Sequence, residues 1–422
     1  MADIAPFRGI RFNPEHVKLG GVLAPPYDVI TDEARETLYG RNLRNIVRID
    51  YGARYDDDVP GVNDAYTRAD GFLHTWLDLE ILVREEAPSL YVSDHEFVHP
   101  SGEVVRRRGV FATVAARRWR DAPVRPHERT LAAPKEDRLA LLRATAVQSS
   151  PVFALWRGGA IPELIDDTAT GDALLGGRTY GELGSEKHRL WRVDDPSRVA
   201  SLVDAMRSAT LYVADGHHRY ETAVAYAEER HLRDPRCLVY LASAGDPALV
   251  ILPTHRLVRP GPTAFSLDDL WARLDDSWDV EPVADVLEAD RVAAAMRVSD
   301  HAFVVAARDG AAVLHRPRHE HATPRERLDA SVLETDVLRP AGVSADAIAA
   351  GALAYTRDLH ALEVSVRSGA AMLGFGLQPT TVDEVLAVAD AGESMPQKST
   401  YFYPKVPTGM VLLPTWTDAQ GD

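Results

Sequence analysis

The stretch Leu211-Tyr-Val-Ala-Asp-Gly-His-His-Arg-Tyr-Glu-Thr-Ala223 changes its character in the middle. Residues 211–214 are apolar and typical of a strand, whereas the apolar residues after Gly216 recur at helical spacing among charged ones. The pattern predicts a strand, a tight turn at Asp215-Gly216 and a helix that starts at the turn. The start of a helix carries unpaired N–H groups and the positive end of the macrodipole, so it suits an anion.

The side chains of this turn allow two interpretations. Gly216 lets a ligand approach the backbone closely, Arg219 can bind phosphate or carboxylate oxygens, and His217 and His218 can exchange protons near neutral pH. Together with Asp215 they indicate a phosphate-binding turn. The alternative is a surface helix whose first turn is polar. The density of such groups in one turn favours the phosphate-binding interpretation.

A second polar stretch runs from Arg125 to Arg143. Pro134 suits the first turn of a helix, because its missing N–H is not needed there. The strongly polar side chains in this stretch include His127, Glu128, Lys135, Asp137 and Arg138. They predict either a second wall of an active site, with Glu128 or His127 as a base, or a solvated loop that leads into a helix.

Two further segments carry candidate ligands. Asp28 lies in Ala24-Pro-Pro-Tyr-Asp-Val-Ile30, where two prolines stiffen the backbone. Its carboxylate could bind a metal or a substrate, or cap local N–H groups. Near the end of the sequence, Lys398, Ser399, Thr400 and Lys405 suit an anion, and the alternative is an ordinary surface turn.

The totals limit the class of protein. The chain has 422 residues and a net charge of −16, which opposes non-specific binding of nucleic acid. It has one cysteine, Cys237, in an apolar run that predicts a buried strand. No signal peptide is evident, and no apolar run approaches the roughly 20 residues of a membrane span. We therefore expect a soluble, cytoplasmic protein without a membrane or nucleic-acid partner, and leave open whether it forms a homo-oligomer.

The distribution of elements predicts a mixed α/β (α+β) fold with a partly antiparallel sheet. We expect three regions: an N-terminal α/β region (1–120), a central region with the phosphate turn (121–258) and a C-terminal α+β region (259–422). Residues 45–50 are predicted to form a strand, and residues 63–86 a single helix. Thr31 is predicted to cap one helix, and Thr380-Thr-Val-Asp-Glu384 to open another as a capping pattern.

Several blocks, in the same order, resemble the prokaryotic family known as domain-of-unknown-function family 1015. The resemblance runs almost from end to end. It is carried by Pro6-Phe-Arg-Gly-Ile-Arg-Phe-Asn-Pro14, Ala24-Pro-Pro-Tyr-Asp-Val-Ile30, Asn45-Ile-Val-Arg48, Pro126-His-Glu-Arg-Thr130, Pro134-Lys-Glu-Asp-Arg-Leu139, Ala214-Asp-Gly-His-His-Arg-Tyr-Glu-Thr-Ala223 and Met395-Pro-Gln-Lys-Ser-Thr-Tyr-Phe-Tyr-Pro-Lys405. The resemblance favours the view that these polar blocks form one site.

A shorter likeness concerns mechanism. Gly216-His-His-Arg-Tyr220 is similar to the phosphate box of the ParB and sulfiredoxin superfamily, which includes free-serine kinases. The likeness implies a ParB/sulfiredoxin-like core with additional α+β segments, in which residues 216–219 hold the phosphates of ATP or ADP. It also implies an acidic residue that activates the hydroxyl of a serine-like acceptor. Glu128 is the first choice for this residue, and Asp28 and Asp137 are the reserves.

The kinase hypothesis needs phosphate charge to be neutralised, by basic groups and by Mg²⁺. Asp28, Asp137 or Asp215 could supply hard oxygen ligands to that ion. Two other classes stay open: a nucleotide-binding regulatory protein without turnover, and a metal-dependent hydrolase that uses His217, His218 and a carboxylate. The hydrolase ranks last, because adjacent residues of a helix point in different directions and seldom bind one metal together.

Overall fold

A computed structural model of the chain describes residues 2–130, 132–158, 161–260, 267–308, 310–319 and 322–416. Contacts define two compact units. Unit 1 comprises Met1–Pro126, Thr130–Val250 and Pro404–Asp422, and unit 2 comprises His127–Arg129 and Ile251–Tyr403. The three regions predicted from the sequence are consecutive stretches of the chain. The two units are defined by contacts instead and do not test that division, which stays a prediction.

Unit 1 is built on a nine-stranded mixed sheet with the order β6-β11-β8-β12-β5-β4-β10-β9, in which β1 also pairs with β5. β6 runs parallel to β11 and β8 parallel to β12, and the other neighbours are antiparallel. The mixed α/β fold with a partly antiparallel sheet is therefore confirmed. The strands are β1 (Ile4–Ala5), β4 (Leu90–Val98), β5 (Val104–Ala115), β6 (Val124–Arg125), β8 (Val152–Arg157), β9 (Leu175–Gly181), β10 (Gly184–Val193), β11 (Thr210–Asp215) and β12 (Arg236–Ser243).

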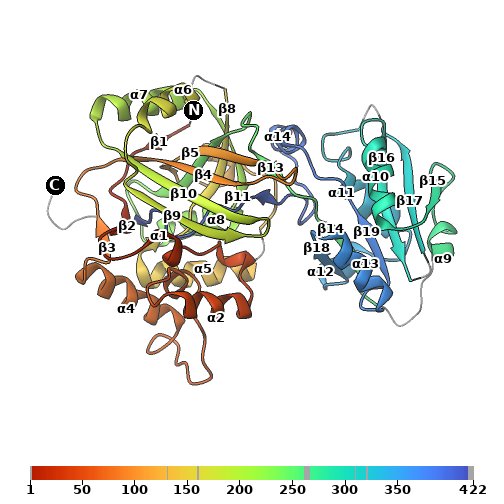
Figure 1. Cartoon of the computed structure of the whole chain (residues 1–422), viewed down its shortest axis with the longest axis horizontal. Helices are drawn as coiled ribbons and strands as arrows, with labels where there is room; N and C mark the ends of the chain where they lie inside the picture. The colour runs from red at the N-terminus through yellow and green to blue at the C-terminus, as the bar shows by residue number, and fades with distance from the viewer. Residues whose placement is uncertain are drawn as a thin grey trace. The chain divides into compact units, whose positions relative to one another are not determined.

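The two faces of this sheet differ in chemistry. One face is apolar and carries the main core, with residues such as Val92, Val110 and Val239. α6 (Ile161–Thr168) and α7 (Pro196–Arg207) lie on this side and bury Ile165, Leu202 and Met206 against it (Figure 1). Cys237 is buried in the same core, as its sequence predicts. The opposite face carries aromatic side chains of the same strands, among them Phe111, Phe153 and Tyr240, whose rings contact one another.

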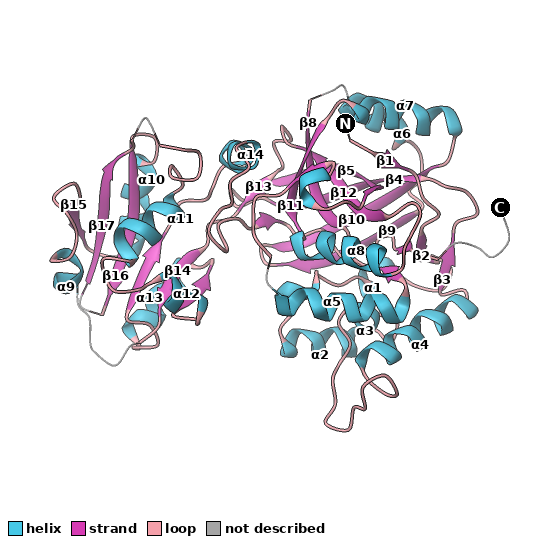
Figure 2. Ribbon diagram, turned by 180° about the vertical axis from the view of Figure 1, so that it is seen from behind, coloured by secondary structure: helices cyan, strands magenta, loops and turns pink. Residues whose placement is uncertain are grey.

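The remaining helices of unit 1 include α8 (His217–Glu229) and α5 (Ala132–Thr145), which pack side by side through Leu139, Leu142 and Tyr226 (Figure 2). The other elements of unit 1 are α1 (Leu19–Val22), α2 (Asp32–Arg41), α3 (Val47–Asp50), α4 (Ala65–Asp78), the 3₁₀ turns η1 (Tyr27–Val29) and η2 (Trp119–Asp121), and the strands β2 (Ile10–Phe12), β3 (Leu82–Arg84), β7 (Val147–Gln148) and β21 (Leu413–Pro414).

Two predicted elements are wrong. The strand predicted over residues 45–50 is the short helix α3, because the Asn45 side chain accepts a hydrogen bond from the Val47 N–H (3.0 Å) and starts a turn. The helix predicted over residues 63–86 ends at Asp78. Glu80 has a φ of 53°, which a helix cannot continue, and the chain then enters β3.

Unit 2 contains a six-stranded antiparallel sheet with the order β15-β17-β16-β19-β14-β18. Its strands are β14 (His255–Val258), β15 (Asp279–Val283), β16 (Asp300–Ala307), β17 (Gly310–Pro317), β18 (Leu353–Thr356) and β19 (Leu373–Gly376). The short strands β13 (Val250–Ile251) and β20 (Phe402–Tyr403) lie outside this sheet. Its helices are α9 (Leu267–Trp271), α10 (Val286–Met296), α11 (Asp329–Val332), the π-helix η3 (Leu333–Leu338), α12 (Ala345–Ala349), α13 (Leu359–Arg367) and α14 (Val382–Asp390).

Helix starts in both units follow the expected capping chemistry. Thr31 accepts a hydrogen bond from the Ala34 N–H at the start of α2. Thr381 and Glu384 form a capping box at the start of α14, which confirms the predicted pattern. Within the described ranges, no helix is long and apolar enough to cross a membrane.

Two glycines test the packing of unit 1. A Cβ at Gly109, in the middle of β5, would lie 2.4 Å from the Leu241 carbonyl oxygen and 2.5 Å from the Tyr240 ring, whereas a Cβ at Gly71, in α4, would meet no atom within 4 Å. We expect Gly109→Ala to lower the free energy of unfolding by about 1–3 kcal/mol. Gly71→Ala should raise it by up to about 1 kcal/mol, since alanine favours helix. Denaturant titrations that show equal effects would contradict this packing.

Candidate functional site

The candidate site is organised by the junction of β11 and α8. β11 ends at Asp215, and Gly216 is the N-cap of the 13-residue helix α8. Gly216 has φ 93° and ψ 31°, a left-handed conformation that glycine adopts without steric cost. Gly216 has no side chain with which to cap the helix. The predicted strand, turn and helix are therefore confirmed, and the start of α8 keeps its electropositive character.

A buried ion cluster holds this junction. Asp215 Oδ1 lies 2.6 Å from Lys405 Nζ, and Asp215 Oδ2 pairs with the Arg219 guanidinium. Arg219 also donates to Ser150 Oγ (2.9 Å) and to the Pro151 carbonyl oxygen. We call these residues, with the start of α8, the Asp215 site. Within the cluster two cations face one carboxylate, and the negative charges of Asp28 and Asp50 also act on Arg219.

The charges of the cluster fix its protonation. Burial alone would raise the pKa of Asp215, but Lys405 and Arg219 lower it below the ordinary value of an aspartate. Burial disfavours the charged form of Arg219, but Asp215 and Asp28 more than compensate and raise its pKa. Arg219 is thus held on the protein by several bonds and is preorganised rather than extended into solvent.

The loop that holds Asp28 belongs to the same surroundings. Asp28 and Tyr27 lie in η1, and the Asp28 side chain is exposed. Burial raises the pKa of Tyr27, and the negative charge of Asp28 raises it further. The charges of Asp28 and Tyr27 also act on Arg219. Asp28 is therefore an accessible carboxylate in the electrostatic reach of the Asp215 site.

A small cavity of about 40 Å³ lies beside Arg219 and Tyr27. Asp50 lines it, accepts a hydrogen bond from Ser149 Oγ (2.6 Å) and lies 3.5 Å from Arg138 Nη1. Asp50 Oδ2 and Thr222 Oγ1 have no hydrogen-bond partner among the described residues, although their side chains are almost fully buried. Buried polar atoms without partners are costly, so the cavity suits a small polar group or water.

Asp137 and Arg138 are engaged in structural bonds. Asp137 lies 2.6 Å from Arg138 Nη2 and 2.6 Å from Arg54 Nη2, and it accepts a hydrogen bond from the Tyr66 hydroxyl (2.8 Å). Burial acts to raise the pKa of Asp137, but Arg138 and the other donors lower it overall. The Arg138 guanidinium lies 4.2 Å from the centre of the Tyr27 ring. Asp137 is therefore a weak candidate for a general base.

Lys135 and His217 lie on the other side of α8. Lys135 Nζ lies 3.3 Å from Glu221 Oε2, and the Trp119 indole N–H donates to Glu221 Oε1 (2.7 Å). The His217 ring is buried, with its centre 6.2 Å from that of Trp119, and His218 is half-buried. A cavity of about 240 Å³ is lined by Trp119, Lys135 and Glu221, among others. Lys135 thus faces a cavity distinct from the one beside Asp50.

The other predicted site residues belong to unit 2. His127 Nε2 lies 3.3 Å from Thr400 Oγ1, and the His127 carbonyl accepts a hydrogen bond from the Met395 N–H (2.8 Å). Ser399 donates to the Pro396 carbonyl (2.6 Å), and the charge of Glu128 acts on Arg256. Lys398 has a φ of 57°. Unit 2 thus unites the two predicted stretches around residues 127–128 and 398–400, and their role beside the Asp215 site stays a prediction.

Sequence reasoning missed one cluster of chemically capable residues in unit 1. Within the described ranges, the side chains that could jointly hold a metal ion are His95, Glu186 and His188. The group does not include His217 or His218, on which the hydrolase hypothesis depended. In a strand, Glu186 and His188 are two residues apart and therefore point to the same face, which the sequence could have indicated. The pairing of strands that brings His95 opposite His188 is not visible in the sequence.

The family of the chain follows from comparison with known proteins. The family model described as "Protein of unknown function (DUF1015)" matches residues 4–331. The chain belongs to this family. The resemblance seen in the sequence is thereby confirmed over these residues, and its last block, Met395–Lys405, lies beyond them. No curated protein matches the chain.

Solved structures that resemble this DUF1015 chain share little sequence with it. A mutant of free serine kinase in complex with AMP is 13% identical, with a TM-score of 0.37, over 68% of this chain and 89% of that one. A conserved hypothetical protein from Pyrococcus furiosus is 15% identical, with a TM-score of 0.34, over 68% and 90%. SbnI with a C-terminal truncation from Staphylococcus aureus is 13% identical, with a TM-score of 0.36, over 69% and 84%.

The ion cluster predicts a pH-dependent stability. Asp215→Asn leaves Arg219 and Lys405 without their buried carboxylate, which should cost about 3–5 kcal/mol of unfolding free energy at pH 7. Because the pKa of Asp215 is lowered in the folded state, this contribution is complete above the ordinary aspartate pKa of about 3.9 and is lost as the pH falls below it. The difference between wild type and variant should shrink in denaturant titrations below about pH 4.

Asp204→Asn is the matched control for this prediction. Asp204 pairs with Arg207 at 2.9 Å on the surface of α7, where both side chains are exposed. The loss should stay below about 1 kcal/mol. Equal losses for the two variants would contradict the central role of the buried cluster.

Proposed function

We propose that the chain is a nucleotide-dependent kinase that phosphorylates a hydroxyl of free serine or a serine-like compound. The observation that carries the proposal is the Asp215 site, in which a 13-residue helix starts at a left-handed glycine beside two largely buried cations. Phosphoryl transfer needs positioning and neutralisation of charge more than covalent chemistry. The likeness of residues 216–220 to a phosphate box supports the same assignment.

The phosphates of ATP or ADP would lie at the start of α8. Backbone N–H groups and the helix dipole favour an anion there. Lys405 and Arg219 are already fixed by Asp215, so they would add positive charge without a further entropic cost of ordering. His218, which is half-buried in the first turn of α8, would be the histidine that contributes a donor.

The acceptor hydroxyl needs a carboxylate that takes its proton. Asp28 suits this role better than Asp137, because Asp28 is exposed and acts electrostatically on Arg219, whereas Asp137 is bound by two arginines and a tyrosine. Mg²⁺ bound to phosphate oxygens would neutralise phosphate charge. Glu128, the first choice from the sequence, stays a candidate in unit 2.

The cavity beside Asp50 supports an acceptor with an amino group. Asp50 Oδ2 and Thr222 Oγ1 offer two unpartnered oxygens, within the part of the chain that the structure describes. An ammonium group in this cavity could donate to Asp50, whose negative charge would offset the positive charges of Arg138 and Arg219 on the same lining. A serine-like compound carries such a group two bonds from its hydroxyl-bearing carbon, which makes a compound with both functions a better acceptor than a plain alcohol.

Kinase activity is tested by incubating the protein with Mg²⁺, ATP or ADP, and a panel of hydroxy amino acids and amino alcohols. Wild type should form a phosphorylated product with at least one amino-bearing acceptor. Asp28→Asn should lower kcat about 10²–10⁴-fold, the range for loss of a general base, while the nucleotide Kd changes little. Asp32→Asn alters an exposed carboxylate four residues away and should leave both quantities unchanged.

The outcomes separate the candidate functions. Tight nucleotide binding by calorimetry without any phosphorylated product would replace the kinase with a nucleotide-binding regulatory protein. The absence of both binding and product would remove both proposals. An unaltered kcat in Asp28→Asn, together with product formation, would remove Asp28 as the base.

A further inference from the structure

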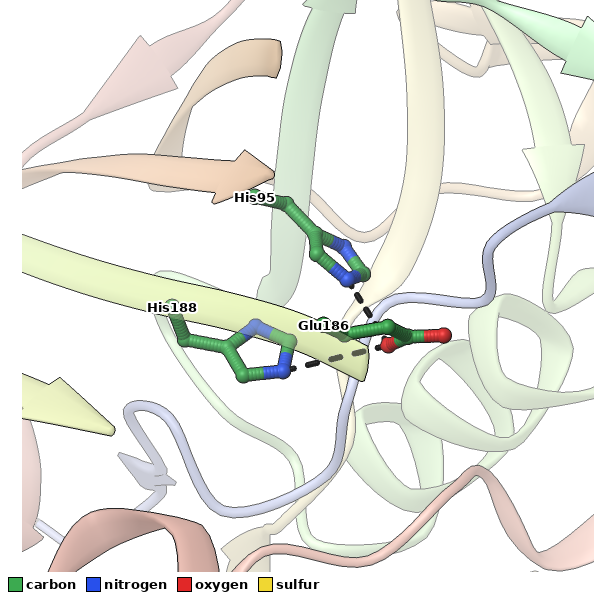
Figure 3. A group of neighbouring side chains, drawn as sticks. All are labelled: His95, Glu186 and His188. Carbon is green, nitrogen blue, oxygen red and sulfur yellow. Dashed lines mark hydrogen bonds and ion pairs between the residues drawn. The ribbon is translucent and has the colours of Figure 1, made fainter. Parts of the chain in front are cut away.

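His95, Glu186 and His188 lie together on the large sheet, on the face opposite the core residues Val92 and Val110 (Figure 3). His95 is on β4 and faces its cross-strand partner His188 on β10. Glu186 is two residues from His188 on the same strand and therefore points to the same face. His95 Nε2 lies 2.8 Å and His188 Nε2 lies 3.9 Å from Glu186 Oε2.

The three side chains are 3%, 8% and 1% exposed, respectively. Burial lowers the pKa of His95, and nearby Arg107 lowers it further. Burial also lowers the pKa of His188, and the neighbouring His95 lowers it further. One nitrogen of each imidazole and one oxygen of the carboxylate all lie within 4.8 Å of one another, so a single ion can reach all three side chains.

We propose that His95, Glu186 and His188 form a binding site for one divalent transition-metal ion. Two imidazoles and one carboxylate are a ligand set used for zinc and for related ions, with at least one further coordination position for water or substrate. Metal–ligand distances of about 2.0–2.2 Å place ligand atoms roughly 3.2–3.5 Å apart, and the observed 2.8 and 3.9 Å bracket that value.

The surroundings define how the site is held. Thr179 Oγ1 lies 2.6 Å from His188 Nε2 and its side chain also hydrogen-bonds Glu186, so a bound ion would displace the hydroxyl from that nitrogen. Gly181 faces Glu186, and a Cβ at this position would lie 1.8 Å from Glu186 Oε1. The glycine thus leaves the space in which the carboxylate sits.

Arg107 is the charge that opposes a cation here. Its Nη2 lies 3.5 Å from His95 Nδ1, on the side of the ring away from Glu186, and donates to the Pro404 carbonyl oxygen (2.8 Å). Arg107 also interacts with the negative charge of Asp246. Burial raises the pKa of Asp246, and the positive charge of Arg107 acts to lower it. Glu186 is therefore not the sole countercharge of Arg107, and its carboxylate can serve the ion.

The proposal is tested on the full chain by calorimetric titration with Zn²⁺, after chelator treatment, and by the absorption spectrum with Co²⁺. Wild type should bind one equivalent of either ion and give visible Co²⁺ bands. Glu186→Gln and His188→Gln each remove one ligand and should weaken Zn²⁺ binding at least 100-fold. His301→Gln is the matched control, since His301 is an equally buried histidine that pairs with Asp329 (2.8 Å) outside the cluster, and it should bind as wild type does.

Two further measurements do not depend on removing a ligand. Gly181→Ala keeps all three ligands but displaces the carboxylate, so it should weaken Zn²⁺ binding. X-ray absorption of the zinc-loaded wild type should show two imidazoles among ligands at about 2.0–2.1 Å. No saturable binding of Zn²⁺ or Co²⁺ by wild type, a zinc spectrum without imidazole, or equal affinity in Glu186→Gln and wild type would overturn the proposal.

Discussion

The Asp215 carboxylate bonded to Lys405 and Arg219 is the interaction on which the candidate site depends. It joins the end of β11, the first turn of α8 and a residue almost 200 positions later in the chain. A buried carboxylate of this kind is retained only when cations repay its desolvation. The same bonds orient both cations beside the start of α8, so the structural role of the cluster and its suitability for an anion have one physical cause.

The elements that the sequence predicts well are those set by local chemistry. The switch from strand to helix at Asp215-Gly216, the cap by Thr31 and the capping box of Thr381 and Glu384 all depend on residues within a few positions of one another. The errors have local causes as well. The side chain of Asn45 starts a helix in a segment of strand-like composition, and the backbone of Glu80 ends a helix inside a periodic run.

The candidate site was predictable only in part, for a reason of distance along the chain. Residues 215–219 are visible as a motif, and Lys405 as a basic residue near the end. The pairing of Lys405 with Asp215 and the position of Asp50 and Ser149 beside Arg219 arise from tertiary contacts. The sequence does not indicate the cluster of His95, Glu186 and His188. These residues come together only through the register of β4 and β10, which pairs His95 with His188.

The most direct test of the account is a crystal structure of the protein with ADP and Mg²⁺. The account predicts that the nucleotide phosphates lie within hydrogen-bond distance, about 2.7–3.2 Å, of the backbone N–H groups that follow Gly216, with Lys405 and Arg219 beside them. A nucleotide bound elsewhere, with the first turn of α8 in contact with solvent alone, would contradict it.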